Sequence, residues 1–261
     1  MKQHQNKIFS WLDPLDFTIG WICALETEYV AARVFLDDRL GHHNVVIAVL
    51  SQGYGTSSAA SVATHMIFSF LNIRIGLLVG ISGGVPSAQD DIRLGDVVVS
   101  VKEHNGLLTA TNGLRAQHEI QGHRIRHSDR LYLPHIVHTS GQSSRCTEAC
   151  GNDSLNLVIR PERAAAEDGI VIHHGLIASG NTVCRDANLR DKFAQKGALC
   201  FEMEVAGLIN YFPCIVIQGI CDYSDSHKNK DWQGYAAMTA AVYAKDLLKH
   251  VAPSRIANRV C

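Results

Sequence analysis

The chain has 261 residues, of which 46% are hydrophobic and 19% charged, and its formal net charge is −1. This size and composition fit one compact domain, and the near-neutral charge with few basic runs argues against a nucleic-acid-binding surface. The opening residues, MKQHQNKIFSWLDPLDF, hold no long apolar core, and no stretch reaches the roughly 18 apolar residues of a membrane span. We therefore expect neither a secretory signal nor a membrane helix, and a cytoplasmic location.

The eight cysteines are scattered rather than arranged as a disulfide framework. Four of them lie in apolar runs, where free thiols pack as small core residues: Cys23, Cys200, Cys214 and Cys221. This placement favours a reducing compartment. Cys146 and Cys150 lie instead in a polar stretch, with His138 upstream. Zinc needs four suitable ligands, and these three fall short, so we expect no metal site.

The first part of the chain predicts strands that alternate with helices. Residues 17–23 (FTIGWIC) form a strand, and the following ALETEYVAARVFL has apolar residues at helical spacing. A second strand at 45–50 runs into a glycine turn and a long helix. A third strand at 75–80 (IGLLVG) ends in the glycine-rich stretch ISGGVP, and a fourth strand covers 96–101.

Two glycine-containing loops in this part are candidates for ligand contact. Residues 80–84 follow a buried strand, and a loop of small residues can present backbone N–H groups to an anion or a sugar. Gly53 and Gly55 follow the second strand, where a plain tight turn is an equally good explanation. Neither loop matches the phosphate-binding pattern or the dinucleotide fingerprint.

The remainder of the chain continues the alternation after an irregular segment. Helical spacing covers 107–126, and residues 127–168, rich in Ser, His and Pro, predict a surface insertion. The neighbouring His173 and His174 fit a strand edge better than a ligand pair. A strand at 176–178 ends in Ser-Gly-Asn, and helices are predicted at 185–196 and 235–250.

This pattern predicts an α/β fold with a largely buried sheet. We expect an N-terminal tail at 1–16, one domain at 17–250 with the insertion at about 127–168, and a C-terminal tail at 251–261.

Residues 199–223 (LCFEMEVAGLINYFPCIVIQGICDY) contain two acidic sites. Glu202 and Glu204 lie where a short strand meets a helix, and Asp222 follows the β-branched run 214–221, which predicts a core strand. Ligands bind outside the carboxyl ends of strands in open α/β sheets, so these carboxylates are candidate site residues. The spacing is equally compatible with a structural role, in which Asp222 caps a loop and Glu204 forms a salt bridge.

Several of these segments together resemble the nucleoside phosphorylase / nucleosidase superfamily, and in particular its fungal branch, often found at the N-terminus of larger multidomain proteins. FEMEVAGL and GICDYSDSHKNK are the most specific matches; FTIGWICALETEYVAA, IRIGLLVGISGGVPSAQDDIRLGDVVVS and HHGLIASGNTVCRD follow the family's order. The resemblance implies a three-layer α/β/α sandwich with a central mixed, partly closed sheet. It also implies an N-ribosyl hydrolase or nucleoside phosphorylase that cleaves the N-glycosidic bond of a purine nucleoside or nucleotide.

The resemblance assigns roles to the acidic residues. Asp222 matches the acid that protonates or hydrogen-bonds the purine at N7, so it must hold a proton near neutrality, which partial burial favours. Met203 and Glu204 match the pair that holds the ribose, with the carboxylate on the 2′- and 3′-hydroxyls. Glu202 matches a flanking acidic position.

The resemblance also places smaller residues near the substrate. Gly80, Ile81, Ser82 and Gly83 match the loop beside the sugar and the nucleophile, and Asn181 lies in a further polar strand end. Val183 falls where nucleosidases place an aromatic residue that packs on the base, and Cys184 follows, where backbone groups can contact the base edge.

Three positions favour water over phosphate as the nucleophile. Glu28 matches the glutamate with which nucleosidases activate water, whereas Leu78 and Ile81 stand where a phosphorylase has an arginine and a serine. Without that arginine and serine a phosphate would be poorly stabilised, so we expect hydrolysis. Phosphate is a co-substrate only in the alternative, in which other arginines, such as Arg93 or Arg185, reach the site.

The resemblance further implies a homo-oligomer and no metal or organic cofactor. Two segments, before residue 45 and after residue 103, are shorter than in relatives. This leaves open a nucleoside-sensing module without useful catalysis.

Overall fold

The computed structural model describes residues 12–36, 43–50, 53, 55–100, 129–138, 146, 150–151, 153–163, 170–209 and 211–251. The predicted helix at 107–126 lies outside these residues. The described part of the predicted insertion contains an isolated bridge between Tyr132 and Leu157 and the short 3₁₀ helix η3 (Ser154–Asn156). In the described ranges, no helix combines the length and the apolar character needed to cross a bilayer.

The strands occur in the predicted order: β1 (Phe17–Cys23), β2 (Asn44–Val49), β3 (Ile75–Gly84), β4 (Val97–Ser100), β5 (Ile172–Ser179), β6 (Ala198–Glu202) and β7 (Cys214–Asp222). The described helices are η1 (Pro14–Asp16), α1 (Glu26–Phe35), α2 (Thr56–Ser69), α5 (Ala187–Ala194), α6 (Val205–Leu208) and α7 (Gln233–Lys249). The first strand has the bounds expected from FTIGWIC. Strand β5 is longer than predicted, and it contains His173 and His174 as expected from their strand-edge interpretation.

All seven described strands belong to one mixed sheet, in the order β2-β1-β3-β6-β5-β4-β7. An additional parallel pairing joins β3 directly to β7, so five of the strands close into a ring while β1 and β2 extend from β3. The pairs β3–β6 and β4–β7 are antiparallel and the other pairs are parallel. The expected mixed, partly closed sheet is therefore confirmed.

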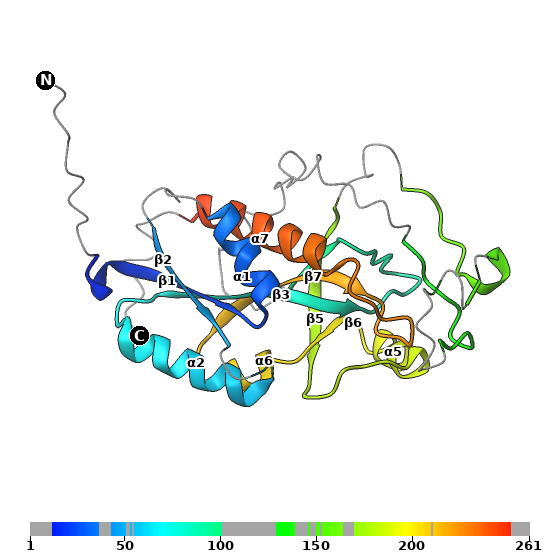
Figure 1. Cartoon of the computed structure of the whole chain (residues 1–261), viewed down its shortest axis with the longest axis horizontal. Coiled ribbons are helices and arrows are strands. Elements are labelled where there is room, and N and C mark those ends of the chain that lie inside the picture. The colour runs from blue at the N-terminus through cyan, green and yellow to red at the C-terminus, as the bar shows by residue number, and fades with distance from the viewer. Residues whose placement is uncertain are drawn as a thin grey trace, which may run out of the picture.

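Helices cover both faces of this sheet (Figure 1). Successive side chains of a strand point to opposite faces, and β3 follows this rule. Leu77 and Val79 pack with α1 and α7 on one face, and Leu78 packs with α2 on the other. A third cluster, which includes Val98, Leu199 and Ile220, combines residues from strands of the ring. The result is the predicted three-layer arrangement.

The predicted end of the third strand was wrong. Residues 81–84 were expected in a loop, but β3 continues through Gly84. Glycine weakens a strand by itself, yet here β7 pairs with β3 as far as Gly83, and β6 pairs with Gly83 and Gly84. Hydrogen bonds from two neighbouring strands thus keep the glycine-rich segment extended.

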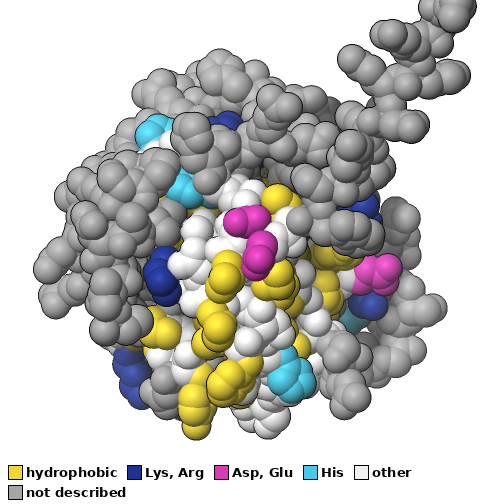
Figure 2. Space-filling view, turned by 90° about the vertical axis from the view of Figure 1, so that its left-hand side faces the viewer, with side chains coloured by type: hydrophobic (Ala, Val, Ile, Leu, Met, Phe, Trp, Pro, Cys, Tyr) yellow, Lys and Arg dark blue, Asp and Glu magenta, His cyan; other side chains and the backbone are white. Residues whose placement is uncertain are grey.

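Apolar side chains also reach the surface. They form a band on the face that Figure 2 shows, and at the end of α2 the side chains of Phe68 and Leu71 are exposed. Exposed apolar surface of this kind is suited to cover by another protein surface. The expected homo-oligomer stays a prediction.

Gly219 of β7 marks the closest approach of α7 to the sheet. A Cβ atom at Gly219 would lie 1.9 Å from the carbonyl oxygen of Ala236. The helix side of this contact is alanine-rich and fully buried, which allows the two backbones to come together. Packing at this point therefore depends on the absence of a side chain.

We predict that Gly219→Ala lowers the free energy of unfolding by about 3 kcal/mol, because the added methyl group collides with backbone that must shift. Gly234→Ala is the matched control. A Cβ at Gly234 meets open space, so a helical alanine there should leave stability unchanged or raise it by up to about 1 kcal/mol. Urea unfolding followed by circular dichroism measures both. Equal stability of the Gly219→Ala variant and the parent would contradict the close approach.

Candidate active site

Glu28 is a buried carboxylate at the start of α1, beside the glycine-rich part of β3. Its Oε2 accepts the backbone N–H groups of Ala24 and Leu25 at 2.7 and 2.9 Å, and its Oε1 accepts that of Ile81 at 2.9 Å. Burial raises the pKa of Glu28 to about 7, against the lowering effect of these three hydrogen bonds, and the charge of Glu204 raises it further. A group with this pKa can accept a proton from water near neutrality.

Glu202 is the last residue of β6, and Glu204 follows two residues later. Oε2 of Glu202 accepts the N–H groups of Glu204 and Val205 at 2.7 and 2.8 Å, so Glu202 caps the short helix α6. Oε1 and Oε2 of Glu204 accept from Gly55 and Met203, each at 3.1 Å. Burial raises the pKa of both carboxyl groups, and the charge of Glu202 adds to the rise at Glu204.

Two further loops close around Glu204. Gly55, which starts α2, has a φ of 111°, a conformation that favours glycine and lets its N–H reach Glu204. The side-chain oxygen of Asn181, after β5, accepts from both the backbone N–H and the hydroxyl of Thr56 at 3.1 and 3.0 Å. The loops after β2, β5 and β6 therefore meet at one place.

Asp222 is the last residue of β7 and is buried. Its Oδ1 accepts the N–H of Ser224 at 2.9 Å, and its Oδ2 lies 2.7 Å from Nζ of Lys228. The two side chains thus form a salt bridge. Sequence analysis missed Lys228, because a lysine in a polar loop carries no periodic signal, although it lies within the specific motif GICDYSDSHKNK.

A β-bulge aims Asp222 toward β3. The register passes from Ser82 opposite Ile220 to Gly83 opposite Asp222, so Cys221 is an extra residue in β7. Bulges of this kind redirect side chains beside functional sites. A Cβ at Gly83 would lie 2.8 Å from Oδ1 of Asp222, and one at Gly80 would lie 2.8 Å from Oε1 of Glu28. The two carboxylates thus fill the space beside two glycines of one strand.

The other predicted substrate contacts lie around these carboxylates. Ser82 is buried, and Ile81 contributes its N–H to Glu28. Val183 and Cys184 are half-buried in the segment after β5. Burial raises the pKa of the Cys184 thiol, and the charge of Lys228 acts against this rise. The structure therefore brings the predicted residues to one end of β3, β5, β6 and β7, while their individual roles remain predictions.

The arginines described near this region are committed to other partners. Arg93 pairs with Asp91, Arg163 with Asp96, and Arg190 with Asp191. Arg160 binds Asp129 and the hydroxyl of Tyr223 at 2.8 and 2.9 Å. Leu78, where a phosphorylase would place an arginine, is packed in the core beneath α2. These four arginines therefore form no cluster that faces the carboxylates, whereas Arg185, directly after Cys184, is exposed.

Comparison with known sequences places this geometry in context. A sequence profile described as the phosphorylase superfamily matches residues 23–252, which confirms the resemblance found in the sequence.

Two curated relatives are longer than this chain. A nucleotide-binding leucine-rich repeat (NLR)-like protein of Hyaloscypha variabilis is 37% identical over 306 residues, covering 94% of this chain and 30% of the relative. The ATP nucleosidase Cap17 of Escherichia coli is 24% identical over 204 residues, covering 75% of this chain and 40% of that protein. The chain therefore spans less than half of either relative. The first alignment is longer than the chain of 261 residues, so that relative carries residues this chain lacks.

Solved structures share the fold. Futalosine hydrolase of Helicobacter pylori superposes with a TM-score of 0.57 at 18% identity, covering 90% of this chain and 99% of that one. A Streptococcus pyogenes S-adenosylhomocysteine nucleosidase in complex with 5-methylthiotubericidin superposes with a TM-score of 0.56 at 19% identity, covering 91% of this chain and 98% of that one. At these identities the likeness establishes the fold alone.

The raised pKa of Glu28 predicts a pH-dependent stability. Between its ordinary value of 4.5 and about 7, Glu28 holds its proton in the folded chain and loses it in the unfolded chain. Its contribution to stability therefore falls as pH rises through this window. Glu28→Gln buries no charge. Its free energy of unfolding, relative to that of the parent, should therefore increase by up to roughly 3 kcal/mol from about pH 4.5 to about pH 8.

Urea unfolding at both ends of the window measures this gain. Glu26→Gln is the control, because Glu26 is exposed in the same helical turn, and its difference from the parent should not change with pH. If the stability difference between Glu28→Gln and the parent were also independent of pH, the burial of a titrating carboxyl group would be contradicted.

Proposed function

The chain belongs to the phosphorylase superfamily, and we propose that it cleaves the N-glycosidic bond of a purine nucleoside or nucleotide by hydrolysis. The observation that carries this proposal is the placement of Glu28 and Asp222 beside Gly80 and Gly83 of the same strand, with Glu204 electrostatically coupled to Glu28. Residues of an extended strand rise about 3.3 Å each, so these two glycines lie on the order of 10 Å apart. In the proposed complex the ribose and the base lie between Glu28 as the proton acceptor and Asp222 as the proton donor.

The proposed reaction uses each carboxylate differently. Water attacks C1′ of the ribose as the C1′–N9 bond breaks, and the electron pair of that bond leaves with the base. Glu28 accepts the proton of the water, and Glu204 accepts hydrogen bonds from the ribose hydroxyls. Asp222 passes a proton to the departing base, and the Lys228 ammonium, whose Nζ lies 2.7 Å from Oδ2 of Asp222, supplies that proton. General acid and base catalysis each contribute roughly 10²- to 10⁴-fold.

Two observations support water over phosphate as the nucleophile. A buried, negatively charged Glu28 beside Gly80 repels an anion, and its pKa of about 7 suits proton abstraction near neutrality. Arg93, Arg160, Arg163 and Arg190 pair with aspartates, so these four do not provide the bidentate contacts that phosphate recognition favours.

The substrate proposal is a purine with or without 5′-phosphates. One relative is named an ATP nucleosidase, and solved relatives of the same fold carry nucleoside analogues. ATP, adenosine and inosine are therefore the first substrates to compare.

The proposal predicts release of free base from at least one of these substrates without added phosphate. Purified protein is incubated with each, with and without phosphate, and the base is separated by chromatography. Release that requires phosphate would overturn hydrolysis in favour of phosphorolysis. Binding of a nucleoside without release of its base, with or without phosphate, would favour a nucleoside-sensing module over an enzyme.

Asp222→Asn is predicted to lower the rate of base release by roughly 10²- to 10⁴-fold, because it removes the group that hands over the proton. The fold should persist, since asparagine retains an oxygen that can accept from Ser224. Lys228→Met should act in the same direction, and Lys230→Met, which changes an exposed lysine two residues away, is its matched control. An unchanged rate in Asp222→Asn, with circular dichroism like that of the parent, would reject the role of Asp222.

A further inference from the structure

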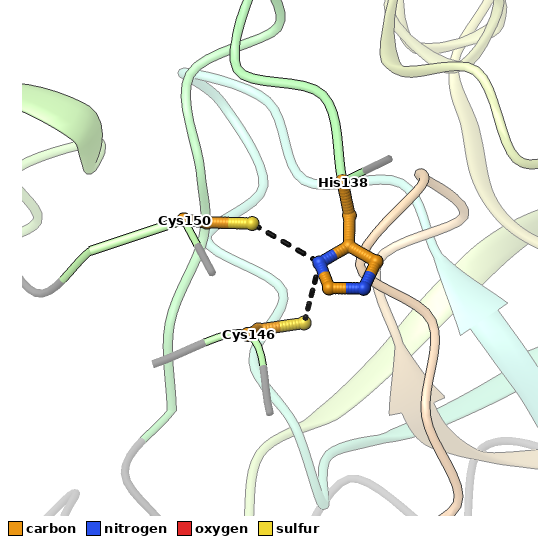
Figure 3. A group of neighbouring side chains, drawn as sticks. All are labelled: His138, Cys146 and Cys150. Atoms are coloured by element: carbon orange, nitrogen blue, oxygen red, sulfur yellow. Dashed lines mark hydrogen bonds between the residues drawn. The ribbon is translucent and has the colours of Figure 1, made fainter. Parts of the chain in front are cut away.

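Two thiols and an imidazole meet outside the carboxylate cluster. Figure 3 shows Sγ of Cys146 and Sγ of Cys150 directed at the same nitrogen, Nδ1 of His138, at 3.7 and 3.1 Å. The three atoms lie within 4.8 Å of one another. Thiolate sulfur and imidazole nitrogen are the ligands that zinc takes in structural sites. We propose that His138, Cys146 and Cys150 bind a zinc ion, independently of the proposed catalytic function.

Hydrogen bonding alone accounts poorly for this arrangement. One ring nitrogen carries either one proton or one lone pair, so it cannot make good hydrogen bonds with two sulfur atoms together. With Zn–S near 2.3 Å and Zn–N near 2.0 Å, sulfur and nitrogen ligands of a tetrahedral ion lie about 3.6 Å apart. The two observed distances, 3.1 and 3.7 Å, bracket this separation. The Cys-x₃-Cys spacing also falls within the usual range for zinc ligands.

His227 is our candidate for the fourth ligand, although its ring nitrogens are not among the atoms that lie within 4.8 Å of one another, so binding requires its side chain to move. It is 8% exposed, and within the described ranges neither of its ring nitrogens makes a hydrogen bond. Its Nδ1 has only a longer contact of 3.5 Å with Asp225. The rings of His138 and His227 have centroids 6.1 Å apart, and Sγ of Cys146 lies 3.6 Å from the His227 carbonyl oxygen. A buried imidazole without a hydrogen bond needs a partner, and a metal ion supplies one.

The backbone carbonyl groups of both cysteines have polar partners of their own. The hydroxyl of Tyr132 lies 3.4 Å from the carbonyl oxygens of both Cys146 and Gly151, and the side-chain amide of Asn156 donates to the carbonyl of Cys150 at 3.0 Å. The Tyr132 ring stacks on His227 with centroids 4.0 Å apart. Preorganised ligands of this kind bind a metal ion without a large ordering cost.

The proposed ion would fasten the insertion to the loop that follows Asp222. The N–H of His138 already donates to Oγ of Ser226 at 2.9 Å, and His227 directly precedes Lys228. A zinc ion shared by His138, both cysteines and His227 would fix the segment that carries the ammonium partner of Asp222. Its role is therefore structural, with all four positions taken by the protein.

The test is the zinc content of the full chain. Protein purified in reducing buffer is loaded with zinc, freed of excess metal, and analysed by atomic emission. We expect one zinc per parent chain and at least a tenfold loss in Cys146→Ser, Cys150→Ser and His138→Ala. The exposed His135, and Cys184, which is not part of the group, provide the controls His135→Gln and Cys184→Ser, which should retain the metal.

Cobalt loading gives a second readout that does not depend on the variants folding. Cobalt bound to the parent should show the intense sulfur-to-metal absorption and the visible bands of a tetrahedral thiolate site. The proposal would be overturned if the parent held no zinc after the loading step, or if the three ligand variants held as much zinc as the parent. A disulfide between Cys146 and Cys150 that persists in reducing buffer would overturn it as well.

His227→Gln tests the fourth position. It should weaken zinc binding about tenfold or more, measured by competition with a chromophoric chelator. An affinity equal to that of the parent would remove His227 from the ligand set.

Discussion

Strand β3 sets the constraint on which the candidate site depends. It pairs with β1 through its first half, with β7 along most of its length and with β6 at its end. At Gly80 and Gly83 the space beside this strand is taken by polar side chains of other elements: Glu28 lies against Gly80, and Ser224 and Asp222 lie against Gly83. A side chain at Gly80 would displace the Glu28 carboxylate, and one at Gly83 would displace Ser224 and Asp222. These glycines therefore allow a carboxylate to approach the strand backbone closely, and they do not form a turn.

The sequence predicted the order of elements well because β-branched runs such as CIVIQGIC leave few alternatives for a buried segment. It failed at Gly83 and Gly84, because glycine usually signals a loop and the supporting pairs from β6 and β7 are non-local. The bulge that aims Asp222 is equally invisible, since it arises from a one-residue offset between two strands. Lys228 and the convergence of His138, Cys146 and His227 depend on loop geometry, which composition does not encode.

The loop after β7 joins the two proposals. Asp222 binds Lys228, Asp225 lies 3.7 Å from Arg190 of α5, and Ser226 binds His138 of the insertion. Tyr223, between them, contacts both Arg160 and Asp129. A segment attached to the sheet, to α5 and to the predicted insertion presents Asp222 in one orientation, which the proposed general acid catalysis requires. The proposed zinc ion would strengthen the last of these three attachments.

The most direct test of the central claim is an experimental structure of the chain with a purine nucleoside transition-state analogue. The account predicts a base nitrogen within about 3 Å of the Asp222 carboxylate and ribose hydroxyls within about 3 Å of Glu204. It also predicts that Glu28 faces the anomeric carbon through a water molecule. An analogue bound away from β3, or one that contacts only one of the two carboxylates Asp222 and Glu204, would contradict it.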